Sequence, residues 1–119
     1  MAITKATTKY GTLVGVPGKC GNTVFKGVPY AKPPVGELRL MPPQEPDFWQ
    51  GERVCDAFSA ACIQYRRKAP AHGAPKGHGA PPPPPPMEQS EDSLYLNIWT
   101  PAETAEEKLP VMLWIHGGG

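Results

Sequence analysis

The sequence has no excess of charge of one sign. Lys and Arg together number 12 and Asp and Glu number 11 among the 119 residues, which gives a formal net charge of +1. A surface without a dominant sign cannot hold a nucleic-acid backbone or an anionic membrane by electrostatic attraction. We therefore expect neither nucleic acid nor a membrane as a partner.

A secretion signal and a membrane-length apolar run are also missing. The start, "MAITKATTKYG", has neither an apolar core nor a small-residue cleavage site. The longest apolar run, 111–115, is far shorter than the ~20 residues that cross a bilayer.

Cysteine is scarce, with three residues, Cys20, Cys55 and Cys62. An odd number without a signal peptide favours free thiols in a reducing compartment, so we expect a cytoplasmic protein. Cys55 and Cys62 have no second Cys or His pair at zinc spacing, and we expect no metal site.

What the sequence has in plenty is proline and glycine, 17 and 13 residues. The stretch "GVPYAKPPVGELRLMPPQEPDFW" can form neither a helix nor a central strand, because proline donates no backbone hydrogen bond. We expect it to run extended across a surface, fixed by its aromatic residues Tyr30, Phe48 and Trp49. Proline and glycine also dominate residues 69–90.

Residues 69–90 form a low-complexity segment with almost no apolar side chain to bury. The six prolines Pro81–Pro86 predict polyproline II structure. The favoured interpretation is a mobile, solvated loop insertion. Two alternatives stay open: metal binding through His72 and His78, and a contact of SH3 or WW type at Pro81–Pro86.

The β-strand signals lie on either side of these segments. "TTKYGTLVGV" and "TVFKGVPY" flank the turn-rich "PGKCGN", which predicts a β-hairpin with a loop longer than two residues. "SLYLNIWTP" alternates Leu and Ile with other residues, as in a strand with two different faces. A short helix is an option around "CDAFSAACIQY", where one face could be shared by Val54, Phe58, Ala61, Cys62 and Tyr65.

The segment "LPVMLWIHGGG" combines an apolar run with three glycines. Its run from Val111 to Ile115 is apolar on both faces, which is typical of a strand in a sheet covered by helices and predicts an α/β fold. Glycines after such a strand let backbone N–H groups turn toward negative charge. Phosphate loops also carry a Lys and a Ser or Thr, which are not seen here. The alternative is the oxyanion hole of an α/β-hydrolase, which carries an HGGG-type motif after a strand, and "WIHGGG" matches this motif.

The chain resembles the type-B carboxylesterases, the family of para-nitrobenzyl esterases, animal carboxylesterases and cholinesterases. Three segments carry the resemblance in the family's order. They are "GTLVG" followed by "FKGVPYAKPPVGELRL", then "SEDSLYLNIWTP", and then "LPVMLWIHGGG". The resemblance covers nearly the whole chain except residues 66–89. It implies that residues 1–119 are the amino-terminal part of a single α/β-hydrolase domain, with residues 69–90 as a loop insertion.

The resemblance also implies the chemistry. The family hydrolyses small carboxylic esters through a serine acyl-enzyme, without metal or cofactor. Gly118 and Gly119 would supply backbone N–H donors to the oxyanion hole. The nucleophile is expected in a G-x-S-x-G elbow, and none of Ser59, Ser90 and Ser93 is flanked by glycines in that way. The nucleophile, acid and base are therefore expected outside these residues, and the fragment alone is expected to be inactive.

Three further residues, Arg39, Glu91 and His116, take structural roles by the same resemblance. Glu91 is expected to pair with Arg39, and breaking this pair would cost ~3 kcal/mol if it is partly buried. His116 is expected to end the strand and brace the glycine loop rather than act as the base. Relatives often have a cysteine at the position of Ser93, disulfide-bonded to one at the position of Cys62. Serine cannot form that bond, which fits an unsecreted, bacterial member.

Two other functions stay open: a non-catalytic cholinesterase-like adhesion module, and a Pro-rich interaction protein.

Overall fold

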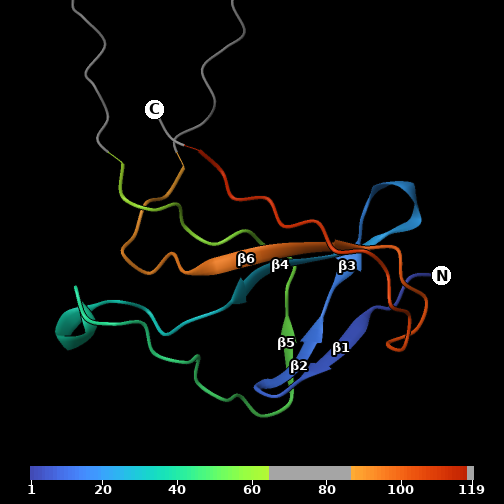
Figure 1. Ribbon diagram of the computed structural model, residues 1–119, viewed down its shortest axis with the longest axis horizontal. Helices are drawn as coiled ribbons and strands as arrows, with labels where there is room; N and C mark the ends of the chain where they lie inside the picture. Colours follow the sequence, from blue (N-terminus) through green and yellow to red (C-terminus); the bar gives the residue numbers. More distant parts are fainter. Residues whose placement is uncertain (65–86, 118–119) are drawn as a thin grey trace, which may run out of the picture.

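The computed structural model describes residues 1–64 and 87–117, and within these ranges the secondary structure consists of six strands and two 3-10 helices. The strands form two small sheets (Figure 1). The first sheet contains β1 (Lys5–Thr8), β2 (Gly11–Val14) and β5 (Glu52–Val54). In it β1 pairs with β2 antiparallel, and β2 pairs with β5 parallel.

The second sheet has the order β3-β4-β6, and both of its pairs are antiparallel. Its strands are β3 (Val16–Pro17), β4 (Thr23–Pro29) and β6 (Tyr95–Thr100). The 3-10 helix η1 (Lys19–Gly21) lies in the loop between β3 and β4, and η2 (Gly36–Leu38) lies in the Pro-rich segment. No helix in the described ranges is both long and apolar enough to cross a membrane.

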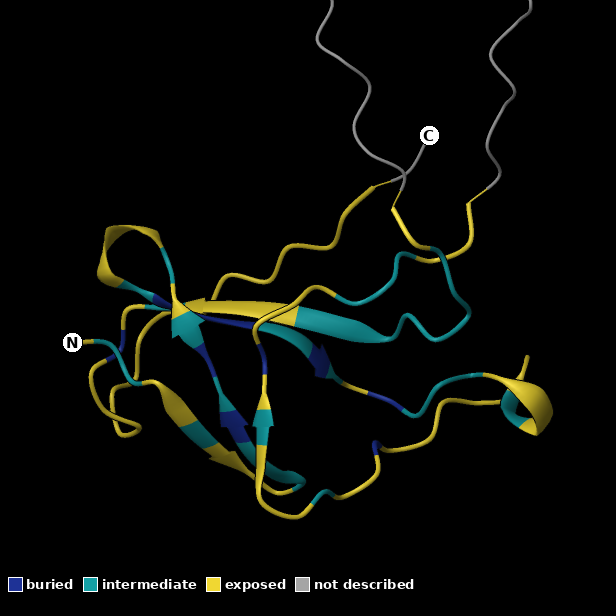
Figure 2. Cartoon of the chain, turned by 180° about the vertical axis from the view of Figure 1, so that it is seen from behind, coloured by how far each residue is buried: buried dark blue, intermediate teal, exposed yellow. Residues whose placement is uncertain are grey.

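The core is small and lies where the two sheets meet. It contains Leu13 of β2, Phe25 and Val28 of β4, and Cys55 just after β5. Trp49 packs against this cluster, and its ring Nε1–H donates a hydrogen bond of 3.1 Å to the carbonyl of Thr12. Figure 2 shows that burial is concentrated on β2 and β4.

The predicted hairpin is confirmed for its second half and wrong for its first. β3 and β4 pair antiparallel across the loop that contains η1. The segment before them, however, is not one strand, because it folds back at Lys9 and Tyr10 into a separate hairpin of β1 and β2. Thr8 makes this turn: its hydroxyl accepts a hydrogen bond from the Tyr10 N–H and donates one to the Gly11 carbonyl. A threonine hydroxyl that bonds to nearby backbone in this way favours a turn over a continuous strand.

The helix considered around residues 55–65 is wrong for its described part, 55–64, which contains none. The backbone of Cys55 is already bonded to both sheets. Its N–H donates to the Val14 carbonyl at 2.7 Å, and its carbonyl accepts from the Lys26 N–H at 2.9 Å. Further along, Ala61 forms an isolated parallel bridge with Gln89. Long-range backbone bonds therefore replace the local ones that a helix requires.

The exclusion of the Pro-rich segment from a central strand is wrong for residues 27–29, which end β4 between β3 and β6. The rest of the segment runs extended apart from η2, as predicted, but only one of its three aromatic anchors is well packed. Trp49 lies against the core, whereas Tyr30 and Phe48 are exposed. Phe48 still makes a tilted ring contact with Tyr10, at 5.5 Å between ring centroids. Among the three aromatic residues, only Trp49 therefore packs against the core.

The two later strand predictions have opposite outcomes. The alternating segment is confirmed as β6, which pairs with β4 and places Leu96 against the core. The prediction of a strand buried on both faces is wrong for this structure: residues 111–115 form no strand, and each is 78–93% exposed. A strand of that kind needs a paired neighbour and covering helices, and no described segment supplies either.

Candidate functional site

The two predicted oxyanion donors, Gly118 and Gly119, lie outside the residues that the structure describes, so their role stays a prediction. The residues directly before them are described and exposed. The Nδ1 atom of His116 lies 3.0 Å from the carbonyl oxygen of Gly117. This contact places the imidazole at the start of the glycine run, next to the backbone that it was predicted to brace.

The predicted pairing of Arg39 with Glu91 is present. The Nε atom of Arg39 lies 2.6 Å from Oε1 of Glu91. The pair joins the turn after η2 to the bend before β6 and so connects the Pro-rich segment to the second sheet. The Arg39 side chain is 64% exposed and that of Glu91 is 37% exposed. The pair is therefore largely solvated, and the larger cost expected of a buried pair does not apply.

Ser93 and Cys62 also lie side by side. The Ser93 hydroxyl donates a hydrogen bond to the Cys62 sulfur at 3.2 Å. Both Cys62 and Cys20 are exposed free thiols, and Cys55 is a buried one. The segment before β6 is thus held from two sides, by Arg39 at Glu91 and by Cys62 at Ser93.

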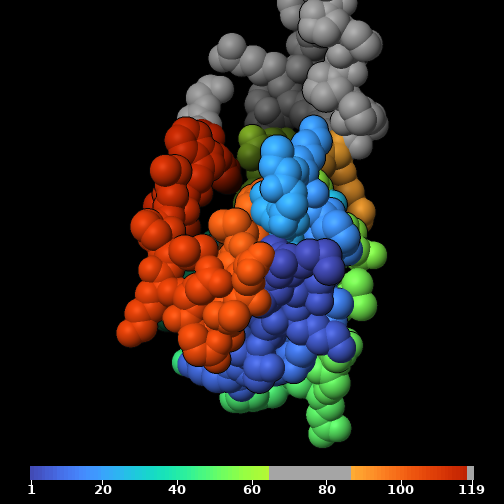
Figure 3. Space-filling view, turned by 90° about the vertical axis from the view of Figure 1, so that its right-hand side faces the viewer, coloured from blue at the N-terminus to red at the C-terminus, as the bar shows by residue number. Residues whose placement is uncertain are grey.

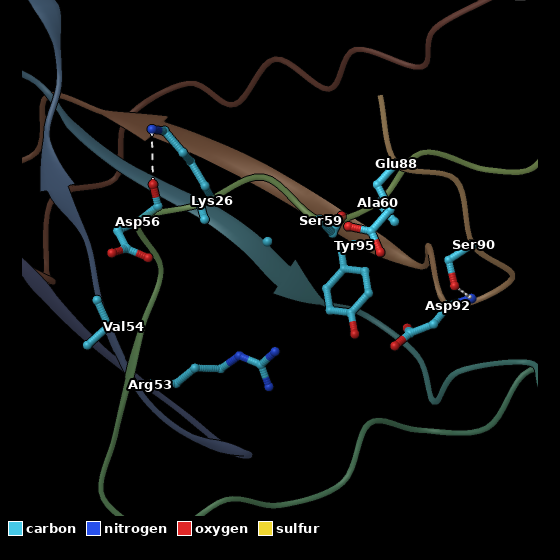
Figure 4. Close-up of a pocket in the computed structure, with 12 residues that line it drawn as sticks. Lys26, Arg53, Val54, Asp56, Ser59, Ala60, Glu88, Ser90, Asp92 and Tyr95 are labelled. Carbon is cyan, nitrogen blue, oxygen red and sulfur yellow. Dashed lines mark hydrogen bonds between the residues drawn. The ribbon is translucent and has the colours of Figure 1, made fainter. Parts of the chain in front are cut away.

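A polar pocket of about 360 Å³ lies where β4, the segment after β5 and the segment before β6 converge (Figure 4). Its charged lining residues are Lys26, Arg53, Asp56, Glu88 and Asp92. The Nζ atom of Lys26 donates to the Asp56 carbonyl at 3.1 Å, and the Arg53 guanidinium lies over the Trp49 ring. The sequence analysis did not find this pocket.

Tyr95 contributes a phenol group to the lining of the pocket. In Figure 4 its hydroxyl points between the Arg53 guanidinium and the Asp92 carboxylate. Burial raises the pKa of Tyr95, and the neighbouring Asp92 raises it further. The phenol therefore stays protonated at neutral pH and can donate a hydrogen bond, but it cannot act as a base. The Asp92 N–H donates to the Ser90 hydroxyl at 3.0 Å, which orders the turn beside it.

The described residues do not bring together a catalytic apparatus. His116 is the only histidine among them, and its recorded contact is with the Gly117 carbonyl, not with a serine. Within the same ranges, no cluster of His, Cys, Asp and Glu could hold a metal ion. What this part of the chain does provide is the two sheets and the connecting segment that precede the glycine run.

Comparison with known proteins identifies the family to which these residues belong. The profile of the carboxylesterase family matches residues 3–119. The chain belongs to the carboxylesterase family. Among curated relatives, mouse acylcarnitine hydrolase is 46% identical over 110 residues, covering 91% of this chain and 19% of the relative. The medium-chain fatty acyl-CoA hydrolase precursor of the duck Anas platyrhynchos is 39% identical over 127 residues, covering 97% of this chain and 21% of the relative.

Solved structures support the same assignment. A carboxylesterase of Geobacillus stearothermophilus matches with a TM-score of 0.74 and 40% identity, covering 98% of this chain and 20% of that one. Such esterases have the α/β-hydrolase fold, so the two small sheets described here are part of that fold. The chain spans about a fifth of the length of the relatives that it matches.

Sequence reasoning missed the pocket because its residues come from three separate segments. Lys26, Arg53 and Asp92 are far apart in the chain and belong to no shared motif. The one available signal is the adjacent pair of acidic residues Glu91 and Asp92, of which the sequence assigned a role only to Glu91, as the partner of Arg39. The structure shows that these neighbours face different partners: Glu91 binds Arg39, whereas Asp92 lines the pocket.

Proposed function

We propose that these residues belong to a carboxylic ester hydrolase that acts through a serine acyl-enzyme. The observation that carries the proposal is the carboxylesterase family match over residues 3–119, which includes the "WIHGGG" motif. The names of the relatives support it, since an acylcarnitine is a carboxylic ester and a fatty acyl-CoA is the related thioester. The substrate class is therefore a small molecule that carries an acyl ester.

In this proposal the chain supplies oxyanion stabilisation. The backbone N–H groups of Gly118 and Gly119 would donate to the oxygen of the tetrahedral intermediate, where negative charge develops. Glycine suits this position because the absence of Cβ leaves space for the acyl group and permits a positive φ. The nucleophile, the acid and the base would come from residues beyond these 119, because the sequence contains no G-x-S-x-G elbow.

The test uses the open reading frame that encodes these residues, expressed together with its downstream sequence. We expect it to hydrolyse para-nitrophenyl acetate and to be labelled covalently by a fluorophosphonate, which reacts with activated serines. The 119-residue chain expressed alone should do neither. A folded longer protein that resists the fluorophosphonate would instead be a non-catalytic binding module.

We also propose that the protein is cytoplasmic. The support is the free thiol of Cys62, which faces the hydroxyl of Ser93 in place of a second thiol that could form a disulfide with it. A protein that folds in a reducing compartment gains nothing from that bond. Cell fractionation of the native host tests this: recovery of the protein in the culture medium or the periplasm would contradict it.

A further inference from the structure

The segment after β5 and the segment before β6 are bonded to each other directly. The Ala61 N–H donates a hydrogen bond to the Glu88 carbonyl, and the Ala61 carbonyl accepts one from the Ser90 N–H, both at 2.9 Å. These bonds make an isolated parallel bridge between Ala61 and Gln89. In Figures 1 and 3 the two segments, yellow-green and orange, lie at the same end of the molecule. The bend before β6 is thus attached to the segment that follows β5.

Two side-chain contacts reinforce the bridge. The Gln64 N–H donates to Oε1 of Gln89 at 3.1 Å, and the Ser93 hydroxyl donates to the Cys62 sulfur at 3.2 Å. Together with the bridge they give four hydrogen bonds between the two segments, and Cys62 remains a free thiol. The two segments are therefore held together without a covalent cross-link.

These contacts fix a bend that carries two acidic residues. Glu91 pairs with Arg39 of the Pro-rich segment, and Asp92 lines the polar pocket. The Asp92 N–H also donates to the Ser90 hydroxyl, so a residue that takes part in the bridge also orders the bend. β6 begins at Tyr95, shortly after the bend. Release of the bend would therefore move both acidic side chains and the start of β6 together.

The direction of the bridge restricts how its two sides can be connected. An antiparallel pair can be joined by a two-residue turn, whereas a parallel pair needs a crossover connection of about a dozen residues or more. Residues 65–86, which lie outside the described part of the chain, make this connection. Their number exceeds that minimum, and the four hydrogen bonds are made by residues on either side of them. The bridge therefore depends on the length of the connection and not on its sequence.

From these contacts we infer that residues 61–64 and 87–93 form a latch, which holds the bend before β6 without a covalent cross-link. The latch requires a connection of about a dozen residues or more between its two sides. It accepts longer connections of any sequence, because the entropy of loop closure grows only slowly with length. Both sides of the latch lie within the described residues, and the inference does not depend on esterase activity.

The test compares three connections in the longer protein expressed from the open reading frame. The first is the natural one, the second lacks residues 71–80 and so keeps about a dozen residues, and the third replaces residues 65–86 with Asn-Gly, a two-residue turn. Hydrogen exchange of the Ala61 and Ser90 amides reports the bridge, since both N–H groups donate in it. Exchange in the first two proteins should agree within about threefold, as expected from the small change in closure entropy. Exchange in the third should be on the order of tenfold faster, because both bonds are lost, while the amides of β2 and β4 stay protected.

Substitutions at Gln89 test the latch with the natural connection. Gln89→Ala removes the acceptor of the Gln64 N–H and should speed exchange of the Gln64 and Ala61 amides several-fold. Gln89→Glu keeps an acceptor oxygen and should change these rates little. Gln44→Ala is the control outside the latch, since the Gln44 side chain donates to the Pro42 carbonyl, and it should leave the same rates unchanged.

Three results would overturn the inference. The first is slow exchange at Ala61 and Ser90 with the Asn-Gly connection, because a parallel bridge cannot form across a two-residue turn. The second is fast exchange, or failure to fold by circular dichroism, in the protein that lacks residues 71–80. The third is equal exchange in Gln89→Ala, Gln89→Glu and the unaltered protein. The last two results decide the matter even if the Asn-Gly protein does not fold.

Discussion

The hydroxyl of Ser93 lies 3.2 Å from the sulfur of Cys62 and donates a hydrogen bond to it. This contact brings the two segments together, and a sulfur in place of the hydroxyl would face the Cys62 sulfur. A disulfide bond is about 2.05 Å long, and a shift of about 1 Å would close the remaining gap.

Ser93→Cys should therefore form a disulfide with Cys62 under oxidising conditions. The cross-linked residues are 31 positions apart, and a loop of that size predicts a gain of ~3–4 kcal/mol in the free energy of unfolding. Mass spectrometry should show the loss of two hydrogens, and reduction should remove the gain. Ser93→Ala is the control and should gain nothing. A variant that keeps both thiols free in air would contradict the placement of these segments.

The ion pair of Arg39 and Glu91 should contribute little to stability. Both side chains are more than a third exposed, so water and salt screen their attraction, and we expect a coupling energy of ~0–1 kcal/mol. A double-mutant cycle with Arg39→Ala and Glu91→Ala measures it in urea, at low and at high salt. The coupling should shrink as salt is added. A coupling of several kcal/mol that salt does not change would mean that the pair is buried.

Gly27 should tolerate alanine less well than Gly21 does. Both have a positive φ, +65° and +78°, which costs an L-residue ~1–2 kcal/mol. A Cβ at Gly21 meets nothing within 4 Å, whereas one at Gly27 would lie 2.9 Å from the Ala57 carbonyl oxygen. Gly27→Ala should therefore lose at least ~1 kcal/mol more than Gly21→Ala, as overpacked substitutions do. Equal losses would show that Ala57 does not pack against β4.

Asn97 should stabilise the irregularity at which Gly27 lies. The pairing of β4 with β6 shifts register between Phe25 and Val28, and there the Gly27 N–H donates to the Asn97 side-chain oxygen at 2.9 Å. Asn97→Ala removes this exposed hydrogen bond, for a loss of ~0.5–1.5 kcal/mol. Asn97→Asp keeps an acceptor and should recover most of it. If both variants lose the same amount, the hydrogen bond is not the cause.

The three thiols should differ in reactivity. Burial raises the pKa of Cys55 above its ordinary value of 9.0, whereas Cys20 and Cys62 are exposed. An aromatic disulfide reagent at neutral pH should label two thiols quickly and Cys55 only on unfolding. Because the pKa of Cys55 is raised in the folded state, its stabilising contribution is complete below pH 9 and is lost as the pH rises through the raised value. Equally fast labelling of all three thiols would contradict this burial.

How far the sequence predicts the structure depends on where each segment finds its hydrogen bonds. β6 was predictable because its alternating residues face two environments, and Leu96 does pack against the core. β5 was not, because "ERV" becomes a strand only by pairing with β2, about 40 positions earlier in the chain. The turn at Thr8 depends on a side-chain hydrogen bond that periodicity does not show.

The candidate site was likewise predictable only in part. A motif of contiguous residues pointed to the glycine run, whereas the pairing of Arg39 with Glu91 was predicted from the resemblance to the carboxylesterases. The pocket around Tyr95 could not be found, since its lining comes from segments that only the two-sheet packing brings together. The run at Val111 was predicted from its own composition, but a strand buried on both faces also depends on partners, and no described segment provides them.

The measurement that most directly tests the central claim is kcat and KM for Gly118→Val in the longer protein expressed from the open reading frame. Oxyanion donors act on charge that develops in the transition state, so disturbing one should lower kcat on the order of 10²–10³-fold and change KM much less. Gly119→Ala is the matched variant and should be more active than Gly118→Val, because alanine adds only a methyl group to the loop. A Gly118→Val enzyme that is folded by circular dichroism and keeps a near-normal kcat would contradict the account, and "WIHGGG" would then be a structural turn.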